Sequence, residues 1–250
     1  TTINVALNAS TYKIIHGENT GDTEYFKKGF ASDEEREAYE AELCATVEAE
    51  GAALLKNENN ALPLASGAKV SLFGHGSVDL MYGGTGSGSV DTSKAPNLKQ
   101  ALEAQGITIN QTLWDLYSSD SMMSKYSRLT PASISDTLEA NTQYAVNEAP
   151  WSALSSAESS FAEYGDAAIV VLSRSGGEGA DLPSGENGTS DSWISGQEGD
   201  GNYLALSAEE IELLKNLKAL KDNGTFKNIV VLINSSNAIE LDFLNPEICG

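Results

Sequence analysis

Short apolar runs separated by longer amphipathic stretches dominate the chain from about residue 70 onward. Four of these runs are rich in β-branched residues and stop at glycine or polar residues, a pattern typical of strands buried in a sheet. They lie at 70–73, 107–109, 167–172 and 229–233. Because the runs alternate with helical patterns, the order predicts an α/β fold with a doubly wound, mostly parallel sheet and helices on both faces.

Helix starts are marked by two capping boxes. In the first, Ser32 is placed to accept a hydrogen bond from the backbone of Glu35, whose side chain reaches back, and a helix is expected towards Ala52. Ser207 and Glu210 repeat this pattern. The second helix is expected to bury an apolar stripe and to end at a glycine. The stripe and the stop are Ile211, Leu214, Leu217, Leu220 and Gly224.

Two further stretches are expected to be helical. Residues 96–105 predict a helix stopped by Gly106, and most of 111–163 has a helical pattern. In contrast, residues 183–203 are polar and rich in Gly, Ser and Asp. A connection of that length in a compact domain is typical of a functional flap or a mobile segment.

Composition restricts the partners. The chain has 36 acidic and 15 basic residues, and a formal net charge of -21 opposes binding to nucleic acid or to an anionic membrane. Neutral partners such as sugars remain open, and the charge also fits a simple role in solubility. The two cysteines, Cys44 and Cys249, form no CxxC pair, and His16 and His75 lie far apart. This pattern predicts neither a metal site nor a disulfide framework.

One carboxylic acid, Glu178, stands among small residues directly after the run 167–172, in the segment Ser173-Arg174-Ser175-Gly176-Gly177-Glu178-Gly179-Ala180-Asp181. Ligands of open α/β sheets bind beyond the carboxyl ends of the strands, so Glu178 is expected to face a cleft. Burial beside an apolar strand would raise the pKa of its carboxyl group. The alternative interpretation is a solvated loop acid with no role.

Other chemistries fit the chain less well. The glycine-rich loop at residues 83–88 lacks the Gly-Lys-Ser/Thr of a P-loop, and the turn after the first strand places Asp79 where the dinucleotide fingerprint needs its third glycine. The loop can instead offer the hydroxyl groups of Thr85 and Ser87 to a polyol. No GxSxG motif is present for a serine nucleophile. Carboxylate chemistry, as in glycoside hydrolysis with its two acids, is the remaining candidate.

Four motifs in order make residues 46–250 resemble the α/β sandwich domain of glycoside hydrolase family 3, which includes β-glucosidases and β-xylosidases. They are Glu50-Gly51-Ala52-Ala53-Leu54-Leu55-Lys56-Asn57-Glu58 with Ala61-Leu62-Pro63-Leu64, the run 70–74, the glycine-rich loop 83–88, and the segment 173–181. The resemblance implies that Glu178 is the general acid/base. It also implies that Gly84, Thr85, Ser87 and Asp181 contact the carbohydrate substrate, and it implies no cofactor and no metal.

The resemblance also implies an incomplete enzyme. In the family the nucleophilic Asp lies in a separate (β/α)8 barrel, just before a Trp, and this chain has no Asp-Trp pair. The chain is therefore expected to be a fragment, truncated at its carboxyl end, whose partner is the barrel domain of the same protein. The sandwich is expected to precede that barrel. By itself the chain is expected to be inactive.

Residues 1–45 are assigned to an N-terminal extension with the start of the first helix. An extracytoplasmic or cell-surface location is expected, with an upstream signal or anchor removed. Two alternatives of other classes remain at this point. One is a non-catalytic carbohydrate-binding or regulatory α/β module, which shares the fold but not the chemistry, and the other is a nucleotide-binding protein.

Overall fold

The computed structural model describes residues 29–84, 86–129, 145–176 and 203–241, with isolated positions at 5, 8, 11, 12 and 15. Two units can be distinguished, Thr1–Asn57 and Glu58–Gly250, and each is described by itself. Within the described residues, no helix combines the length and the apolar character needed to cross a bilayer.

The first unit contains helix α2 (Asp33–Gly51), which starts where the capping signal predicted. The side chain of Ser32 accepts a hydrogen bond from the Glu35 backbone N–H at 3.2 Å. The reciprocal contact is shifted by one residue, because Glu35 Oε2 accepts from the backbone of Ala31 at 2.7 Å. Acidic residues in the first turn, beginning with Asp33, complement the helix dipole at this end.

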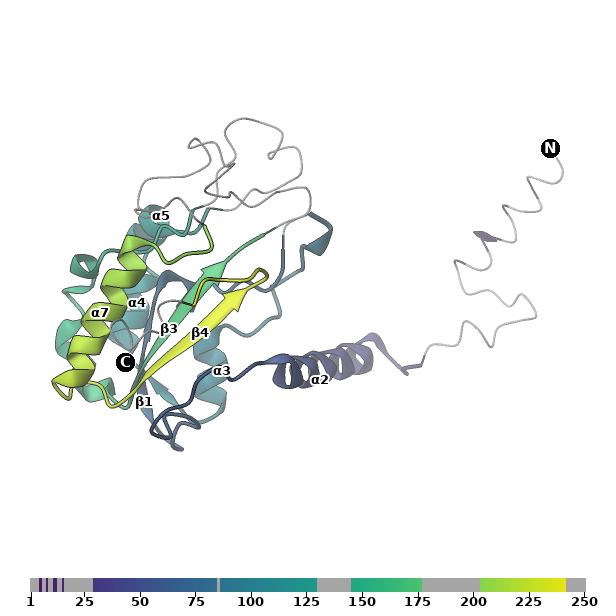
Figure 1. The fold of residues 1–250 in the computed structure, drawn as a ribbon. Helices are drawn as coiled ribbons and strands as arrows, with labels where there is room; N and C mark the ends of the chain where they lie inside the picture. The colour runs from purple at the N-terminus through teal and green to yellow at the C-terminus, as the bar shows by residue number, and fades with distance from the viewer. Residues whose placement is uncertain are drawn as a thin grey trace, which may run out of the picture. The chain divides into compact units, whose positions relative to one another are not determined.

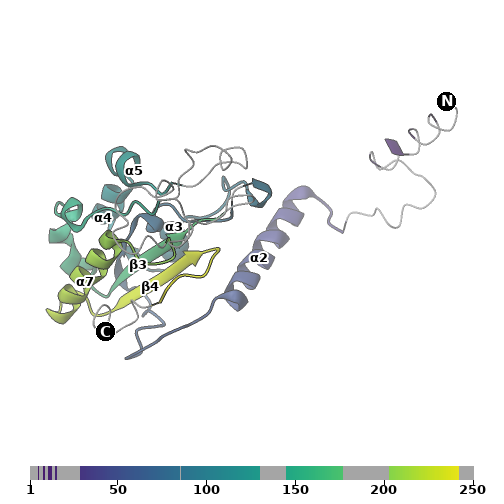
Figure 2. The same ribbon diagram turned by 45° about the horizontal axis from the view of Figure 1, so that its top comes forward.

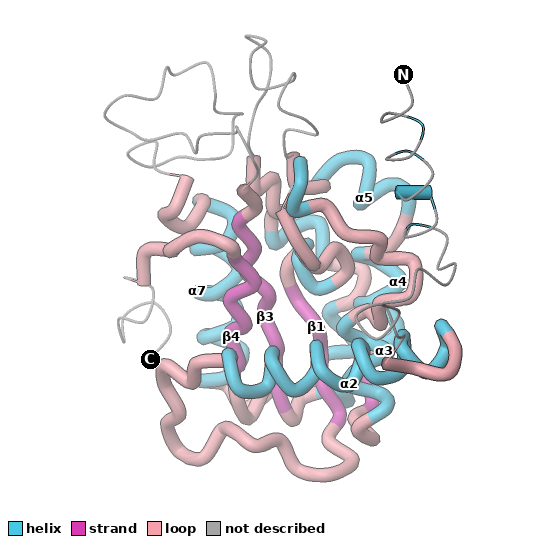
Figure 3. Tube along the Cα trace, turned by 90° about the vertical axis from the view of Figure 1, so that its right-hand side faces the viewer, coloured by secondary structure: helices cyan, strands magenta, loops and turns pink. Residues whose placement is uncertain are grey.

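The second unit is built on a parallel sheet of four strands in the order β2-β1-β3-β4, and Figure 3 shows β1, β3 and β4 side by side. The strands are β1 (Lys69–Phe73), β2 (Thr108–Ile109), β3 (Ala167–Arg174) and β4 (Ile229–Ser235). β3 pairs in parallel with β1 and with β4. The predicted α/β fold with a parallel sheet is confirmed.

Helices and 3-10 turns connect the strands. Their bounds are η2 (His75–Ser77), η3 (Gly86–Gly88), α3 (Leu98–Ala104), α4 (Gln111–Tyr117), α5 (Asp120–Tyr126), η4 (Trp151–Leu154), η5 (Glu158–Tyr164) and α7 (Ala208–Asp222). The described parts of 111–163 are short helices and 3-10 turns, because new caps at Asn110 and Ser119 restart the helix each time. α7 has the complete capping box predicted at Ser207 and Glu210.

The two faces of the sheet bury separate cores, since side chains alternate along each strand. On one face, α7 and α4 pack over a core that includes three aromatic rings, those of Phe73, Phe161 and Phe226. On the other face, Leu98 and Leu102 of α3 pack on a core that includes Val70. Figures 1 and 2 show α7 and α3 on opposite sides of the strands. In α7 the buried apolar side chains are Leu213, Leu214 and Leu217, so the buried stripe includes Leu213, and the predicted members Ile211 and Leu220 are only half-buried.

The strand order creates a switch point between β1 and β3. From β1 the chain crosses to β2 on one side, and later strands are added on the other side, beginning with β3. The carboxyl ends of two such neighbouring strands leave a crevice where doubly wound folds bind ligands. The chain leaves β1 at Gly74 and β3 at Ser175, so these two turns lie at the switch point.

Candidate active site

The turn after β1 passes close to β3, and Gly74 makes this possible. Its φ is +83°, a conformation that side chains disfavour, and a Cβ here would lie 2.7 Å from the carbonyl oxygen of Val171. The backbone N–H of Gly74 donates to the hydroxyl of the buried Tyr117 at 3.2 Å. The turn after β1 is therefore fixed by the close approach to β3 and by the buried hydroxyl of Tyr117.

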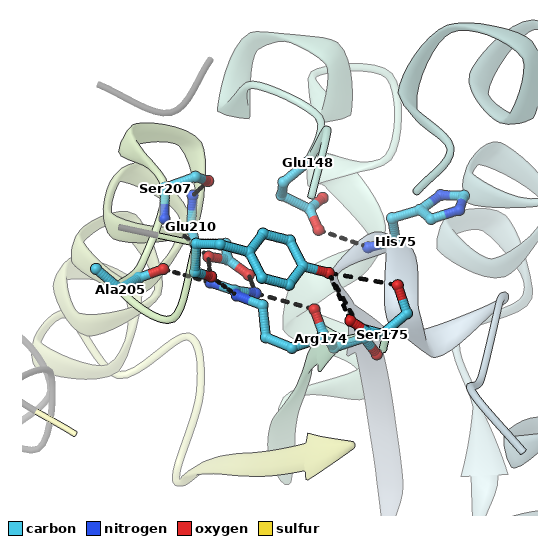
Figure 4. A network of polar contacts seen from close by, with 9 residues as sticks. His75, Glu148, Arg174, Ser175, Ala205, Ser207 and Glu210 are labelled. Carbon is cyan, nitrogen blue, oxygen red and sulfur yellow. Dashed lines mark hydrogen bonds and ion pairs between the residues drawn. The ribbon is translucent and has the colours of Figure 1, made fainter. Parts of the chain in front are cut away.

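The last residue of β3, Arg174, is fully buried although it is charged. All five of its N–H donors have acceptors, as Figure 4 shows in part. Two reach the Glu210 carboxylate at 2.8 and 2.7 Å. The other three reach the carbonyl oxygens of Tyr203 at 2.7 Å, Ser173 at 2.9 Å and Ala205 at 2.6 Å. This network joins the end of β3 to the start of α7, because Glu210 also caps that helix.

The same network ties together the two ends of the segment 177–202, which lies outside the described residues. The backbone N–H of Ser175 donates to the hydroxyl of Tyr203 at 3.0 Å. The Arg174 guanidinium lies 5.7 Å from the centre of the Tyr203 ring, within the range of a cation–π contact. Ser175 and Tyr203 therefore lie beside the same strand end.

A second buried acid, Glu148, lies at the same edge. Its carboxylate accepts hydrogen bonds from the backbone of His75 at 2.7 Å and of Ala149 at 2.9 Å. Figure 4 shows it pointing towards His75. Burial raises the pKa of Glu148 to about 7, and the two backbone hydrogen bonds only partly oppose this. Nothing in the local sequence indicated the burial of Glu148 beside the turn after β1, because His75 lies 73 positions away along the chain.

A polar hollow of about 300 Å³ is formed mainly by the connection between β1 and α3. Its lining is Val78, Asp79, Leu80, Met81, Tyr82, Gly83, Gly84, Ser89, Val90, Thr92 and Arg128. The glycine-rich loop closes tightly on itself here. A Cβ on Gly83 would lie 2.8 Å from the carbonyl oxygen of Gly88, so a larger residue would open the loop.

Two lining residues of the hollow, Asp79 and Arg128, form a cluster of charged or ionisable groups with the buried His75. Asp79 Oδ2 lies 3.2 Å from Arg128 Nη2 and 3.4 Å from His75 Nε2. The His75 contact lacks hydrogen-bond geometry, and Nε2 has no hydrogen-bond partner among the described residues. Burial alone would raise the pKa of Asp79, but His75 and Arg128 outweigh it and hold the pKa below its usual range. The Asp79 carboxylate is therefore charged at neutral pH.

Two of the predicted substrate-contacting residues can be placed. Gly84 lines the hollow, and Ser87 lies exposed in the turn η3 of the same loop. Glu178, Thr85 and Asp181 lie outside the described residues. In the part of the chain that the structure describes, no three His, Cys, Asp or Glu side chains are close enough to hold a metal ion.

Comparison with known proteins links this geometry to one enzyme family. The model of the glycosyl hydrolase family 3 C-terminal domain matches residues 52–249. Beta-glucosidase A of Butyrivibrio fibrisolvens is 29% identical over 223 residues, which are 82% of this chain and 24% of that protein.

Two solved structures of beta-glucosidases contain a domain of similar fold. A beta-glucosidase from Paenibacillus barengoltzii superposes with a TM-score of 0.59 at 26% identity, covering 83% of this chain and 20% of that one. Beta-glucosidase 3B from Thermotoga neapolitana, in complex with alpha-D-glucose, gives a TM-score of 0.61 at 23% identity, covering 88% and 27%. The latter likeness concerns the fold alone. The chain thus spans about a quarter of the length of these relatives.

Proposed function

The chain belongs to glycoside hydrolase family 3 through that family's C-terminal domain, and on this premise we propose that it supplies the general acid/base of a retaining β-glycosidase. Glu178 is the proposed acid/base. It would protonate the glycosidic oxygen as the bond breaks and later remove a proton from the attacking water. The proposed substrates are terminal β-linked sugars, β-glucosides first, because the relatives are beta-glucosidases.

The observation that carries the proposal is the anchoring of β3 at the switch point. Glu178 follows Arg174 by four positions, and the buried contacts of Arg174 and Tyr203 hold both ends of its segment at one strand end. A general acid must be held within hydrogen-bond reach of the atom that it protonates. An anchored strand end beside the ligand crevice supports this role for a nearby carboxyl group.

The glycine-rich loop supports a sugar site at the same edge. Gly84 lines a hollow with mostly polar walls, and Ser87 offers a hydroxyl group from an adjacent turn. Backbone amides and hydroxyl groups are suited to the hydroxyl groups of a neutral sugar. Thr85 and Asp181 remain predicted substrate contacts. The bounds of the domain, residues 46–250, also remain a prediction. So does an extracytoplasmic or cell-surface location.

A retaining mechanism needs a second carboxylate as nucleophile, about 5 Å from the first. We assign this group to a (β/α)8 barrel domain of the same protein, the proposed partner of this domain. The relatives are about four to five times as long as the matched region, which leaves room for such a domain. The 250-residue chain without a barrel is accordingly proposed to be inactive.

The test uses the product of the complete gene and three chains: wild type, Glu178→Gln and Glu186→Gln. Glu186 is a matched control, another acid beside a glycine in the same segment. With an aryl β-glucoside whose leaving group needs protonation, Glu178→Gln should lose about 10²- to 10⁴-fold in kcat, and the control should stay near wild type. With a dinitrophenyl glucoside the loss in the bond-breaking step should be much smaller, because that leaving group departs without a proton.

Normal turnover of Glu178→Gln on the first substrate would exclude the acid/base role. Hydrolysis by residues 1–250 alone would exclude the proposed division between two domains. If the isolated chain instead binds glucose or cellobiose at millimolar or better affinity without hydrolysis, and Glu178→Gln leaves the full-length protein unaffected, a non-catalytic carbohydrate-binding module is the better assignment.

A further inference from the structure

We propose that Asn234 is a positioning residue that holds the glycine-rich loop, residues 83–88, in place over the carboxyl edge of the sheet. Its role in sugar binding rests on the proposed function, whereas its role in anchoring the loop does not. Asn234 is the next-to-last residue of β4 and is only partly buried. Sequence motifs gave it no role.

The side-chain amide of Asn234 pairs with both backbone groups of Met81. The Met81 N–H donates to Asn234 Oδ1 at 2.6 Å, and Asn234 Nδ2 donates to the Met81 carbonyl oxygen at 2.9 Å. This pair of hydrogen bonds resembles the pairing of two residues in adjacent β-strands, although Asn234 and Met81 are 153 positions apart. It restricts both the position and the orientation of the Met81 peptide groups, which a single hydrogen bond would not do.

The contact also fixes the path of the loop. β1 and β4 are not neighbours, because β3 lies between them. The chain that leaves β1 must therefore pass the end of β3 before Met81 can reach Asn234. Ser173 of β3 is the register partner of Asn234, and its hydroxyl donates to Asn234 Oδ1 at 3.2 Å. One amide thus connects β3, β4 and the connection that follows β1.

A displacement at Met81 would also displace the glycine-rich loop. Met81 lies two residues before Gly83, and Gly83 packs against the backbone of Gly88. The turn is closed further by a hydrogen bond from the Ser89 N–H to the Gly86 carbonyl at 3.0 Å. Since the loop is closed at its base, it should move as one piece when the Met81 anchor is lost, and its Gly84 and Ser87 would shift together.

The amide group is specifically required. Asn234→Leu keeps the branched shape and the number of side-chain heavy atoms but removes both the donor and the acceptor. Asn234→Asp keeps the acceptor for the Met81 N–H but sets a carboxylate against the Met81 carbonyl oxygen. Asn216→Leu is the matched control, because the hydrogen bond that Asn216 makes within the described residues is local, from Nδ2 to the Glu212 carbonyl in α7 at 2.8 Å.

The first experiment measures amide hydrogen exchange in the full-length protein for peptides that cover residues 80–90. Asn234→Leu should accelerate exchange at Met81 by about tenfold or more, since this N–H loses its acceptor. Asn216→Leu should leave exchange there unchanged. Wild-type exchange in Asn234→Leu would overturn the anchoring role, and this result does not depend on any enzymatic activity.

The second experiment measures steady-state hydrolysis of an aryl β-glucoside by the same proteins. A misplaced binding loop should raise KM about tenfold and change kcat less than about threefold, with Asn234→Asp between wild type and Asn234→Leu. An unchanged KM, or an equal loss in Asn216→Leu, would overturn the positioning role. Full activity in Glu178→Gln would remove the proposed acid/base instead, without altering the exchange result, so the two failures are distinguishable.

Discussion

Arg174 and Glu210 form a doubly hydrogen-bonded ion pair with side-chain exposures of 0% and 1%. The pair joins the carboxyl end of β3 to the first turn of α7, at the edge of the sheet where the candidate site lies. A buried pair of this kind adds little stability over an apolar pair of the same shape, but the loss of one partner leaves a buried charge alone. Its main effect is to fix where the strand ends.

Arg174→Met should therefore lower the free energy of unfolding by about 3–5 kcal/mol, measured by urea denaturation at pH 7. Arg174→Lys should recover only part of this, because an ammonium group has three N–H donors and cannot satisfy all five acceptors around Arg174. The matched control is Lys227→Met, which breaks the exposed pair between Lys227 and Asp166 and should cost less than about 1 kcal/mol. Equal losses in Arg174→Met and Lys227→Met would contradict this account.

Glu148 should make stability depend on pH. Its pKa is about 7 in the folded protein against 4.5 for the free group, so between these values the folded state holds a proton that the unfolded chain has lost. Stability should then fall as pH rises through this window, by up to about 3 kcal/mol. Glu148→Gln cannot titrate at this position. The unfolding free energy of wild type minus that of Glu148→Gln should therefore fall by about the same amount from pH 4.5 to pH 8. A difference independent of pH would refute the raised pKa.

Gly74→Ala should destabilise the protein more than Gly106→Ala does. Both glycines have a positive φ, +83° and +77° respectively, so both variants incur the backbone strain of about 1 kcal/mol. Only the Cβ on Gly74 would collide with backbone, the carbonyl oxygen of Val171. An additional loss of about 1–3 kcal/mol is expected there and should appear as a lower urea midpoint. Similar urea midpoints for the two variants would show that the β3 backbone at Val171 can shift at little cost to accommodate the added Cβ.

Asn110 and Asn97 offer a comparison between a buried and a surface helix cap. Each side chain accepts from the backbone three residues on, at 3.2 Å in α4 and 2.8 Å in α3. Asn110 is fully buried and also donates to the hydroxyls of Ser71 and Ser160. Asn97→Ala should cost about 1 kcal/mol, and Asn110→Ala about 2–4 kcal/mol because it also removes buried contacts. If thermal unfolding shows that Asn110→Ala loses no more stability than Asn97→Ala, the buried contacts of Asn110 contribute nothing.

Local patterns in the sequence were sufficient for the four strands, for the starts of the helices with capping boxes and for the fold class, but not for the division of the described parts of 111–163 into short helices and 3-10 turns. The β-branched run at 167–172 and the capping box at Ser207 and Glu210 concern residues that are neighbours along the chain, so their physics is present before folding. The glycines and apolar residues that carry the family resemblance are equally local. They predicted Glu178 as the acid/base, and that assignment remains a proposal with a direct test.

Only the tertiary structure decided how the edge of the sheet is held together. The contact of Glu148 with His75 and that of Asn234 with Met81 join residues 73 and 153 positions apart. No periodicity or motif reports such pairs, because each depends on strand order and on where a loop crosses the sheet. For Arg174 the sequence showed only that it follows an apolar run. The structure shows that it is buried, because the Glu210 carboxylate and three carbonyl oxygens accept its hydrogen bonds.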